Sequence, residues 1–148
     1  MIMETLKICL VDDDRDDRNL FRKAFDELGS QHQLVIFNSG FELMEYLNDE
    51  TTELPDILFL DLNMPNFHGQ DVLEEIRKNE LYNPLSIAIY STSSSEQHIE
   101  DALSAGANIY VIKPNDFEVL KDSIRKSLKI NWQYHNSELD RENFLLVI

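Results

Sequence analysis

Short apolar runs alternate along the chain with segments in which apolar residues recur every three or four positions. The runs are almost entirely apolar, which is typical of strands that are covered on both faces. They are Leu6–Val11, Leu34–Phe37, Ile57–Leu60, Ile87–Tyr90 and Ile109–Ile112. The segments that follow them, such as the one from Leu20 to Leu28, have the spacing of an amphipathic helix. The pattern therefore predicts a strict alternation of strand and helix.

Helix boundaries are marked by recognisable signals. Ser39 with Glu42, and Asn115 with Glu118, have the spacing of a capping box. Gly29 is placed where a helix would stop. Strict alternation of strand and helix requires parallel strands with helices on both faces of the sheet. We expect an α/β fold with an open, doubly wound sheet.

Polar residues follow four of the apolar runs directly. The first run is followed by Asp12 to Asp14, the third by Asp61, the fourth by Ser91 and the fifth by Lys113. In doubly wound sheets the functional site lies beyond the carboxyl ends of the strands, where the strand order reverses. All these ends share one edge of the sheet, so we expect these side chains to converge.

Carboxylates, a hydroxyl and a lysine make a distinctive set of groups. Neighbouring carboxylates repel one another unless a cation lies between them, and oxygen ligands without histidine or thiolate favour Mg²⁺. Lys113 and Ser91 can donate hydrogen bonds to a phosphate. The set predicts a phosphoryl-transfer centre in which the ionised carboxylate of Asp61 is the nucleophile. The backbone carbonyl of Asn63 is a candidate metal ligand, and Pro65 directs the loop.

Each of these features also has an ordinary structural explanation. Asp14, Asp16 and Asp17 could simply place negative charge at a helix N-terminus. Ser91 lies in the stretch "STSSS", which could be a solvated loop, and Lys113 with Pro114 could form a plain turn. Only their joint occurrence at the ends of four strands indicates a site.

Composition narrows the class of protein. The 148 residues fit one domain, and the net charge of -15 disfavours nucleic acid, which is bound through lysine and arginine. The single cysteine, Cys9, cannot form a disulfide within the chain, so we expect a reducing cytoplasm. No secretory signal pattern is present, and no apolar run reaches the roughly 18 residues of a membrane span.

Four motifs together resemble the receiver domain of bacterial two-component response regulators. They are "LVDDD" at 10–14, "LDLNMPNFHG" at 60–69, "YSTSS" at 90–94 and "GANIYVIKP" at 106–114. The resemblance covers roughly residues 5–130, and it is closest to stand-alone receivers of Bacteroidetes type, which share the C-terminal pattern. It implies a flavodoxin-like sheet of five parallel strands in the order 2-1-3-4-5.

The resemblance also implies roles for the acidic residues. Asp61 would be the phosphoacceptor. Asp12 and Asp13 would hold Mg²⁺, Asp13 directly and Asp12 largely through water, with the carbonyl of Asn63 as a further ligand.

A second set of roles concerns the switch. Ser91, in place of the commoner threonine, would bind the phosphoryl group and move toward it, and Lys113 would pair with the phosphate. Taking Thr92 as the hydroxyl instead would break the motif spacings. Tyr110 would turn inward as Ser91 moves, in preference to the alternative that it is a plain strand aromatic. The Lys113–Pro114 bond is expected to be cis.

The implied function is that of a phosphorylated signalling protein rather than an enzyme with a separate substrate. The partners would be a sensor histidine kinase or phosphotransfer protein and a downstream protein target, with neither nucleic acid nor membrane. A pseudo-receiver is disfavoured by the intact acidic residues, and a dehalogenase-like phosphatase by Asn63, which stands where that chemistry needs a carboxylate.

The chain is predicted to divide at residue 130. Residues 1–130 would form the receiver domain, and residues 131–148 a C-terminal extension too short for a DNA-binding output domain. The apolar residues of the extension would either pack back on the domain or form a surface for a partner or a homodimer.

Overall fold

The computed structural model describes residues 5–129 and 145–146. Its parallel sheet has the strand order β2-β1-β3-β4-β5-β6. The strands are β1 Lys7–Val11, β2 Gln33–Phe37, β3 Ile57–Leu60, β4 Ser86–Ser91, β5 Ile109–Ile112 and β6 Leu145–Leu146. The predicted five strands and their order are therefore confirmed. The short strand β6, which pairs with β5 through Tyr110 and Val111, was not expected.

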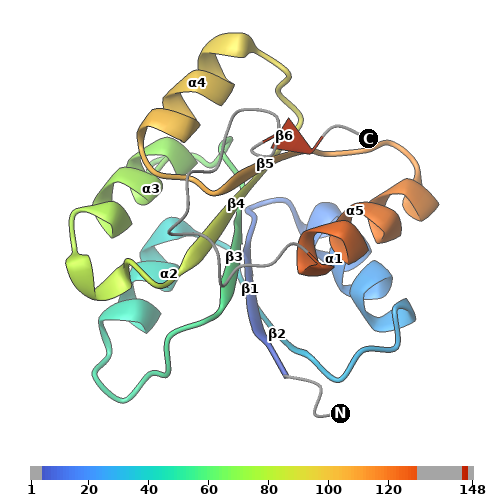
Figure 1. Cartoon of the computed structure of the whole chain (residues 1–148), viewed down its shortest axis with the longest axis horizontal. Coiled ribbons are helices and arrows are strands. Elements are labelled where there is room, and N and C mark those ends of the chain that lie inside the picture. Colours follow the sequence, from blue (N-terminus) through green and yellow to red (C-terminus); the bar gives the residue numbers. More distant parts are fainter. Residues whose placement is uncertain (1–4, 130–144, 147–148) are drawn as a thin grey trace.

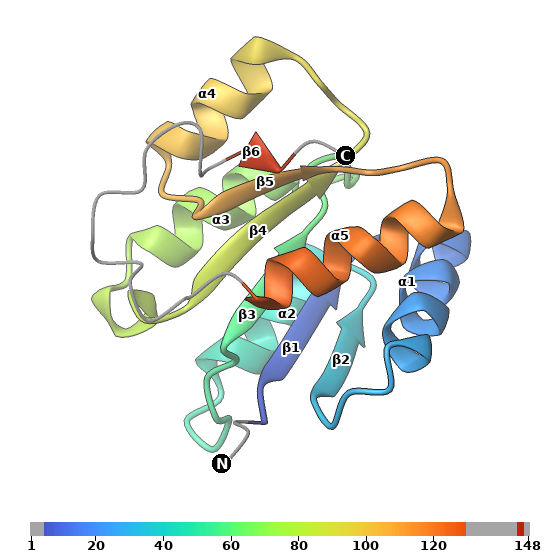
Figure 2. The same cartoon turned by 45° about the vertical axis from the view of Figure 1, so that its right-hand side comes forward.

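Helices cover both faces of the sheet, as the alternation predicts (Figures 1 and 2). Helices α1 and α5 lie together on one face, and α2, α3 and α4 lie on the other. The bounds are α1 Arg15–Glu27, α2 Gly40–Asn48, α3 Gly69–Arg77, α4 Glu96–Ser104 and α5 Phe117–Lys129, with a 3₁₀ turn, η1, at Glu80–Tyr82. In the described part of the chain, no helix has the length and apolarity that crossing a membrane requires.

The core forms two layers, one on each side of the sheet. Along β1, Ile8 and Leu10 belong to the layer under α1 and α5, whereas Cys9 and Val11 belong to the layer under α2 to α4. Successive side chains of a strand point to opposite faces, so a strand covered on both faces must be apolar throughout. Burial raises the pKa of the Cys9 thiol to about 12, which keeps it unreactive.

The helix caps confirm one sequence prediction and correct another. Ser39 Oγ accepts from the Glu42 N–H at 3.2 Å, so Ser39 caps α2 as predicted, while Glu42 Oε1 accepts from the Asn38 N–H at 2.9 Å rather than from that of Ser39. At α5 the capping residue is Asp116 rather than Asn115, because the Asp116 carboxylate accepts from the Val119 N–H at 3.1 Å. A shift of one residue was not visible in the sequence, since Asn and Asp are equally good N-caps.

Candidate functional site

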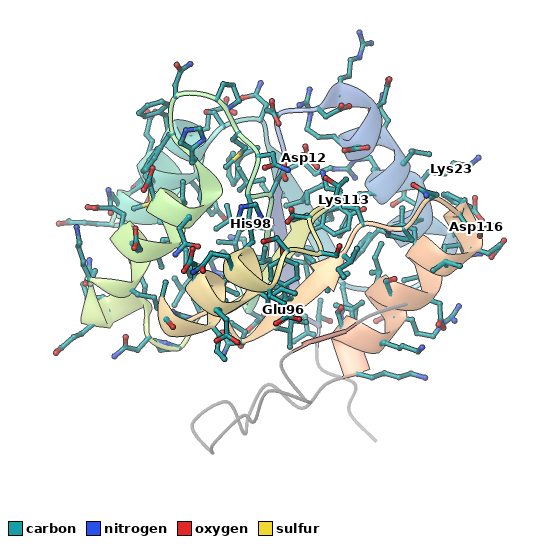
Figure 3. The ribbon with its side chains drawn as sticks, turned by 90° about the horizontal axis from the view of Figure 1, so that it is seen from above. Asp12, Lys23, Glu96, His98, Lys113 and Asp116 are labelled. Atoms are coloured by element: carbon teal, nitrogen blue, oxygen red, sulfur yellow. The ribbon has the colours of Figure 1, made fainter. Side chains whose placement is uncertain are left out.

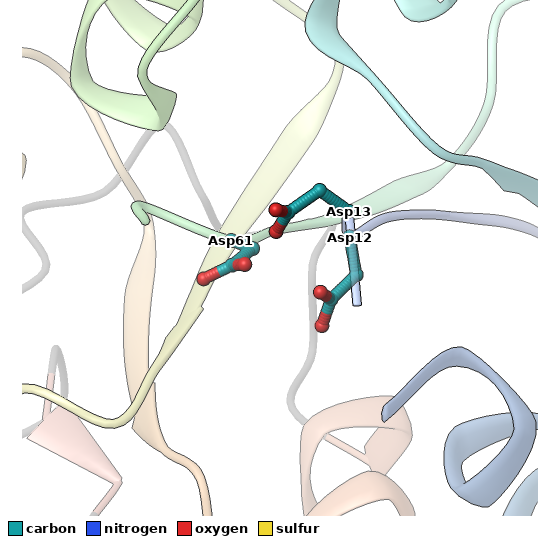
Figure 4. Close-up of side chains that lie close together, drawn as sticks. All are labelled: Asp12, Asp13 and Asp61. Atoms are coloured by element: carbon teal, nitrogen blue, oxygen red, sulfur yellow. The ribbon is translucent and has the colours of Figure 1, made fainter. Parts of the chain in front are cut away.

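Three carboxylates converge at the carboxyl edge of the sheet. Asp12 and Asp13 follow β1, and Asp61 follows the neighbouring strand β3, with Val11 paired to Leu60 at the strand ends. One oxygen from each carboxylate lies within 4.8 Å of the others (Figure 4). Asp12 and Asp61 are buried and Asp13 is exposed. Among the described residues this is the one such group of potential metal ligands.

Backbone N–H groups hold the two buried carboxylates in place. Asp12 Oδ1 accepts from the Asp14 N–H at 2.9 Å, and Asp61 Oδ1 accepts from the Asn63 N–H at 3.1 Å. Asp14 caps α1 by accepting from the N–H groups of the next two helical acids, Asp16 and Asp17. Both explanations of the acidic triplet therefore hold. Asp14 caps helix α1, and Asp12 and Asp13 contribute their carboxylates to the site.

The loop after β3 passes close over the backbone of Asp61. The Gly69 N–H donates to the Leu62 carbonyl at 3.1 Å, and a Cβ at position 69 would lie 2.1 Å from the Asp61 carbonyl oxygen. Asn66 takes a positive φ of 68°, which Asn tolerates better than most residues. Gly69 is thus required by close approach, and the loop it permits fixes the direction of Asp61.

Lys113 reaches the carboxylates from the end of β5. Its Nζ lies 2.8 Å from Asp12 Oδ2, 2.9 Å from Asp17 Oδ2 and 3.7 Å from Asp61 Oδ2. Burial alone would lower the pKa of Lys113, but the hydrogen bonds to Asp12 and Asp17 outweigh it and raise the pKa. The lysine is therefore a fixed positive charge at the site.

The expectation of a cis Lys113–Pro114 bond is wrong, because no peptide bond in the described residues is cis. The trans form of such a bond is favoured by about 0.5–1 kcal/mol unless the surrounding structure selects the other. Lys113 makes its contacts with Asp12 and Asp61 from the trans form.

Asp61 has an unusual titration behaviour. Burial and the neighbouring charge of Asp12 raise its pKa to about 7, although Lys113 and the Asn63 N–H oppose the shift. The repulsion between two buried carboxylates is what a bound cation would relieve. An all-oxygen set of this kind fits a hard divalent cation. The cluster thus suggests divalent metal binding by Asp12, Asp13 and Asp61.

The carboxylates open into a polar cleft of about 480 Å³. Asp13, Asp61, Asn63 and Lys113, all predicted site residues, lie on its walls. The other lining residues are Asp14, Arg15, Asp16, Asp17 and Thr92. The cleft is open to solvent and polar, so it can admit a charged group.

The two predicted switch residues, Ser91 and Tyr110, are not among the residues that line the cleft. Ser91 is buried at the end of β4, where its Oγ accepts from the Ser93 N–H at 3.1 Å. Tyr110 is fully buried, and its hydroxyl donates to the Ser93 carbonyl at 2.9 Å. The hydroxyl-bearing residue that lines the cleft is Thr92. The roles of Ser91 and Tyr110 remain predictions.

The sequence did not reveal the contacts of two further residues, Asp17, which was considered only as helix N-terminal charge, and Ser93. Asp17 pairs with Lys113, and Ser93 bonds both Ser91 and Tyr110. Asp17 lies in the first turn of α1, three residues after the N-cap Asp14, and this place beside the end of β1 is the signal that could have revealed it. Ser93 uses its backbone for both contacts, so its residue type carried no signal.

Comparison with known proteins accounts for this arrangement. The family model described as the response regulator receiver domain matches residues 8–125. The chain belongs to this family. Receiver domains are signalling modules of two-component systems, and the predicted family is thereby confirmed.

Relatives of this receiver domain include curated proteins of similar length. The probable methanogenesis regulatory protein FilR2 of Methanothrix harundinacea is 30% identical over 128 residues, covering 84% of this chain and 82% of that protein. The chemotaxis protein CheY1 of Helicobacter pylori is 28% identical over 126 residues, covering 85% of this chain and 99% of that protein. The similarity thus extends over almost the whole of a short relative.

Solved structures of response regulators share the fold. The Mn²⁺-bound form of Rcp1 has a TM-score of 0.77 at 25% identity, covering 84% of this chain and 96% of that one. The phosphorylated cyanobacterial phytochrome response regulator RcpA also has a TM-score of 0.77, at 30% identity, covering 88% of this chain and 95% of that one. These comparisons establish the flavodoxin-like receiver fold.

Proposed function

We propose that this receiver domain accepts a phosphoryl group on Asp61 from the phosphohistidine of a sensor histidine kinase or phosphotransfer protein, in a Mg²⁺-dependent reaction. The observation that carries the proposal is the convergence of Asp12, Asp13, Asp61 and Lys113 around one open cleft. The Mn²⁺ in the Rcp1 structure and the phosphorylated state of RcpA support it by similarity.

The chemistry of the step follows from the side chains. An oxygen of the ionised Asp61 carboxylate attacks phosphorus, a new O–P bond forms, and the N–P bond breaks with its electron pair returning to the imidazole of the donor. Lys113 Nζ, 3.7 Å from Asp61 Oδ2, is placed to donate to a phosphoryl oxygen.

Asp12, Asp13, Asp61 and the carbonyl of Asn63 would hold Mg²⁺, with Asp12 acting largely through water. When bound, the ion supplies positive charge that keeps Asp61 ionised and offsets the charge of the transferred group. The same site later hydrolyses the acyl phosphate, and the protein needs no other catalytic activity.

The phosphorylated state would be read through Ser91 and Tyr110. In the proposal, Ser91 binds the phosphoryl group and Tyr110 follows, which biases the region of α4, β5 and α5 between two arrangements. A downstream protein target or a second copy of the chain would bind one arrangement.

Residues 1–130 would suffice for this function, and residues 131–148 would add no output domain. The site of action would be the cytoplasm, where Cys9 stays reduced.

Intact-mass measurement tests the phosphoacceptor directly. With Mg²⁺ and acetyl phosphate, the wild-type chain should gain the mass of one phosphoryl group. Asp61→Asn should gain none, and neither should the wild type in EDTA. Asp26→Asn, which removes an exposed carboxylate on α1, is the matched control and should gain the group as the wild type does. Labelling that persists in Asp61→Asn would reject the assignment.

Thermal unfolding tests the metal separately. A few millimolar Mg²⁺ should raise the melting temperature above that in NaCl of equal ionic strength, because the ion binds the folded acid cluster. Asp13→Asn should reduce this rise. An equal response to the two salts would contradict a specific Mg²⁺ site.

A further inference from the structure

Ser93 occupies a junction of hydrogen bonds in the loop between β4 and α4. Its N–H donates to Ser91 Oγ at 3.1 Å, and its carbonyl accepts from the Tyr110 hydroxyl at 2.9 Å. Its own Oγ lies 2.5 Å from His98 Nδ1 and accepts from the Ser95 N–H at 3.2 Å. Every polar atom of this residue therefore has a partner, and the partners lie on three different elements.

His98 makes the connection to helix α4. It is the third residue of the helix, whose N-cap is Ser95, and the Ser95 Oγ accepts from the His98 N–H at 3.4 Å. Figure 3 shows His98 on α4. Its side chain lines a cavity of about 300 Å³ with His68 and Asp71 from the start of α3.

Ser93 Oγ accepts from the Ser95 N–H and also bonds His98 Nδ1. The Ser93–His98 bond can be donated from either side, because a hydroxyl both donates and accepts and the role of Nδ1 depends on the His98 tautomer. This bond ties the first turn of α4 to the loop that carries Ser91.

We propose that Ser93 is the residue through which the movement of Ser91 and Tyr110 reaches α4, and that His98 is the positioning residue that joins the helix to it. The inference rests on the proposed function, because it requires Ser91 to respond to a phosphoryl group on Asp61. A displacement of the Ser93 backbone must carry its Oγ with it, and the bond to His98 transmits that displacement to the helix. Ser95 caps α4 independently, so the helix persists without the bond but no longer follows the loop.

Hydrogen–deuterium exchange of the full chain tests this coupling. Addition of Mg²⁺ and beryllium fluoride, a stable phosphoryl mimic, should change exchange in residues 91–94 and in α4 of the wild type. His98→Ala should keep the change at 91–94 and lose at least about half of the change in α4. Ser93→Ala should do the same, since it retains the backbone bonds to Ser91 and Tyr110.

A substitution that restores the hydrogen bond and a double substitution together test whether the Ser93–His98 bond itself carries the coupling. The amide of Asn can replace imidazole Nδ1, so His98→Asn should restore the response of α4. If the two side chains act through one bond, Ser93→Ala/His98→Ala should be no worse than either single variant. His68→Asn alters a histidine of the same cavity, and Ser94→Ala an exposed serine of the same loop; both should respond as the wild type does.

The outcomes separate the two proposals. A wild-type response of α4 in both His98→Ala and Ser93→Ala, with melting temperatures matched to the wild type, would overturn the coupling alone. Equal losses in His98→Ala and His68→Asn would also overturn it, because the effect would then belong to the cavity. No change at 91–94 in the wild type, together with no gain of phosphoryl mass, would overturn the proposed function and the coupling with it.

Discussion

Individual residues of the site are shaped by burial and close contact. Asp61 is 3% exposed and faces Asp12, which is fully buried, so its charged form is disfavoured in the metal-free protein. Gly69 has no side chain because the Asp61 backbone occupies the space that a Cβ would need. Burying the charge of Asp61 lowers stability, and the position of Gly69 excludes a side chain. Both features orient the Asp61 carboxylate toward the cleft.

Neutralising Asp61 should stabilise the metal-free protein in a pH-dependent way. The pKa of Asp61 is about 7 in the folded state against an ordinary value of 3.8, so between these values the folded state holds a proton that the unfolded state has released. Asp61 therefore lowers stability progressively as pH rises through this window. In EDTA, Asp61→Asn should raise the melting temperature by at least about 3 °C at pH 8 and leave it nearly unchanged at pH 4. Asp26→Asn is the control, and an equal shift in both variants would contradict the burial effect.

Adding a methyl group at position 69 should disturb the site. The new Cβ of Gly69→Ala would lie 2.1 Å from the Asp61 oxygen and 2.6 Å from the Leu62 Cα, so the backbone must move. We expect a loss of about 3 kcal/mol in the free energy of unfolding, together with slower phosphorylation. Gly29→Ala is the comparison, with φ of +65° but no atom within 4 Å. Gly29→Ala should lose less free energy of unfolding, about 1–2 kcal/mol, and its phosphorylation should be unaffected. Equal losses of the two variants in urea unfolding would refute the role of close approach at Gly69.

At the scale of elements, one arginine joins the amino-end side of the sheet to α3. Arg77 donates to the carbonyls of Gly106, Tyr82 and Leu85 at 3.0, 3.0 and 2.8 Å, and to Asn108 Oδ1 at 3.0 Å. Burial lowers its pKa, but the fork of the guanidinium matches four fixed acceptors. Helix α3 is thereby held to η1 and to the loops that precede β4 and β5.

Replacing this arginine should loosen those connections. Arg77→Lys cannot reach all four acceptors, so several of these hydrogen bonds are lost, and we expect a loss of about 2 kcal/mol in the free energy of unfolding, measured by chemical denaturation. Lys78→Ala removes a neighbouring cation whose 3.7 Å pair with Glu75 is exposed, and it should change stability by less than about 0.5 kcal/mol. Equal stability of the two variants would contradict the role assigned to Arg77.

At the scale of the molecule, the receiver fold leaves β5 at the edge of the predicted five-stranded sheet, and β6 covers part of it. The pairing joins Tyr110 to Leu145 and Val111 to Leu146. The matched family model ends at residue 125, before this strand begins. The site itself draws on β1, β3, β4 and β5 and does not involve β6.

Ending the chain after residue 130 should therefore preserve phosphorylation. The truncated protein should gain one phosphoryl group with Mg²⁺ and acetyl phosphate, while its melting temperature falls by a few degrees because β5 loses a neighbour. A full-length chain with Leu145→Pro and Leu146→Pro should show the same fall, since proline cannot donate to the ladder. Failure of the truncated chain to fold or to react would show that the domain extends beyond residue 130.

Most of the fold could be predicted from local patterns. The apolar runs at Ile57–Leu60 and Ile109–Ile112 coincide with the observed strands because a strand buried on both faces leaves a continuous signal. The strand β6 gave no such signal, since two residues are too few to show a period. The capping residue of α5 was displaced by one because adjacent Asn and Asp are chemically equivalent caps.

The order of residues along the chain was enough to establish that an acidic strand end, a hydroxyl and a lysine would meet at one edge, because parallel strands bring their carboxyl ends together whatever the details of packing. Which groups touch was settled by three-dimensional packing. Lys113 lies closer to Asp17 than to Asp61, and the Tyr110 hydroxyl donates to the Ser93 carbonyl. Such contacts depend on helix orientation, loop path and side-chain rotamer, and none of these leaves a periodic trace in the sequence.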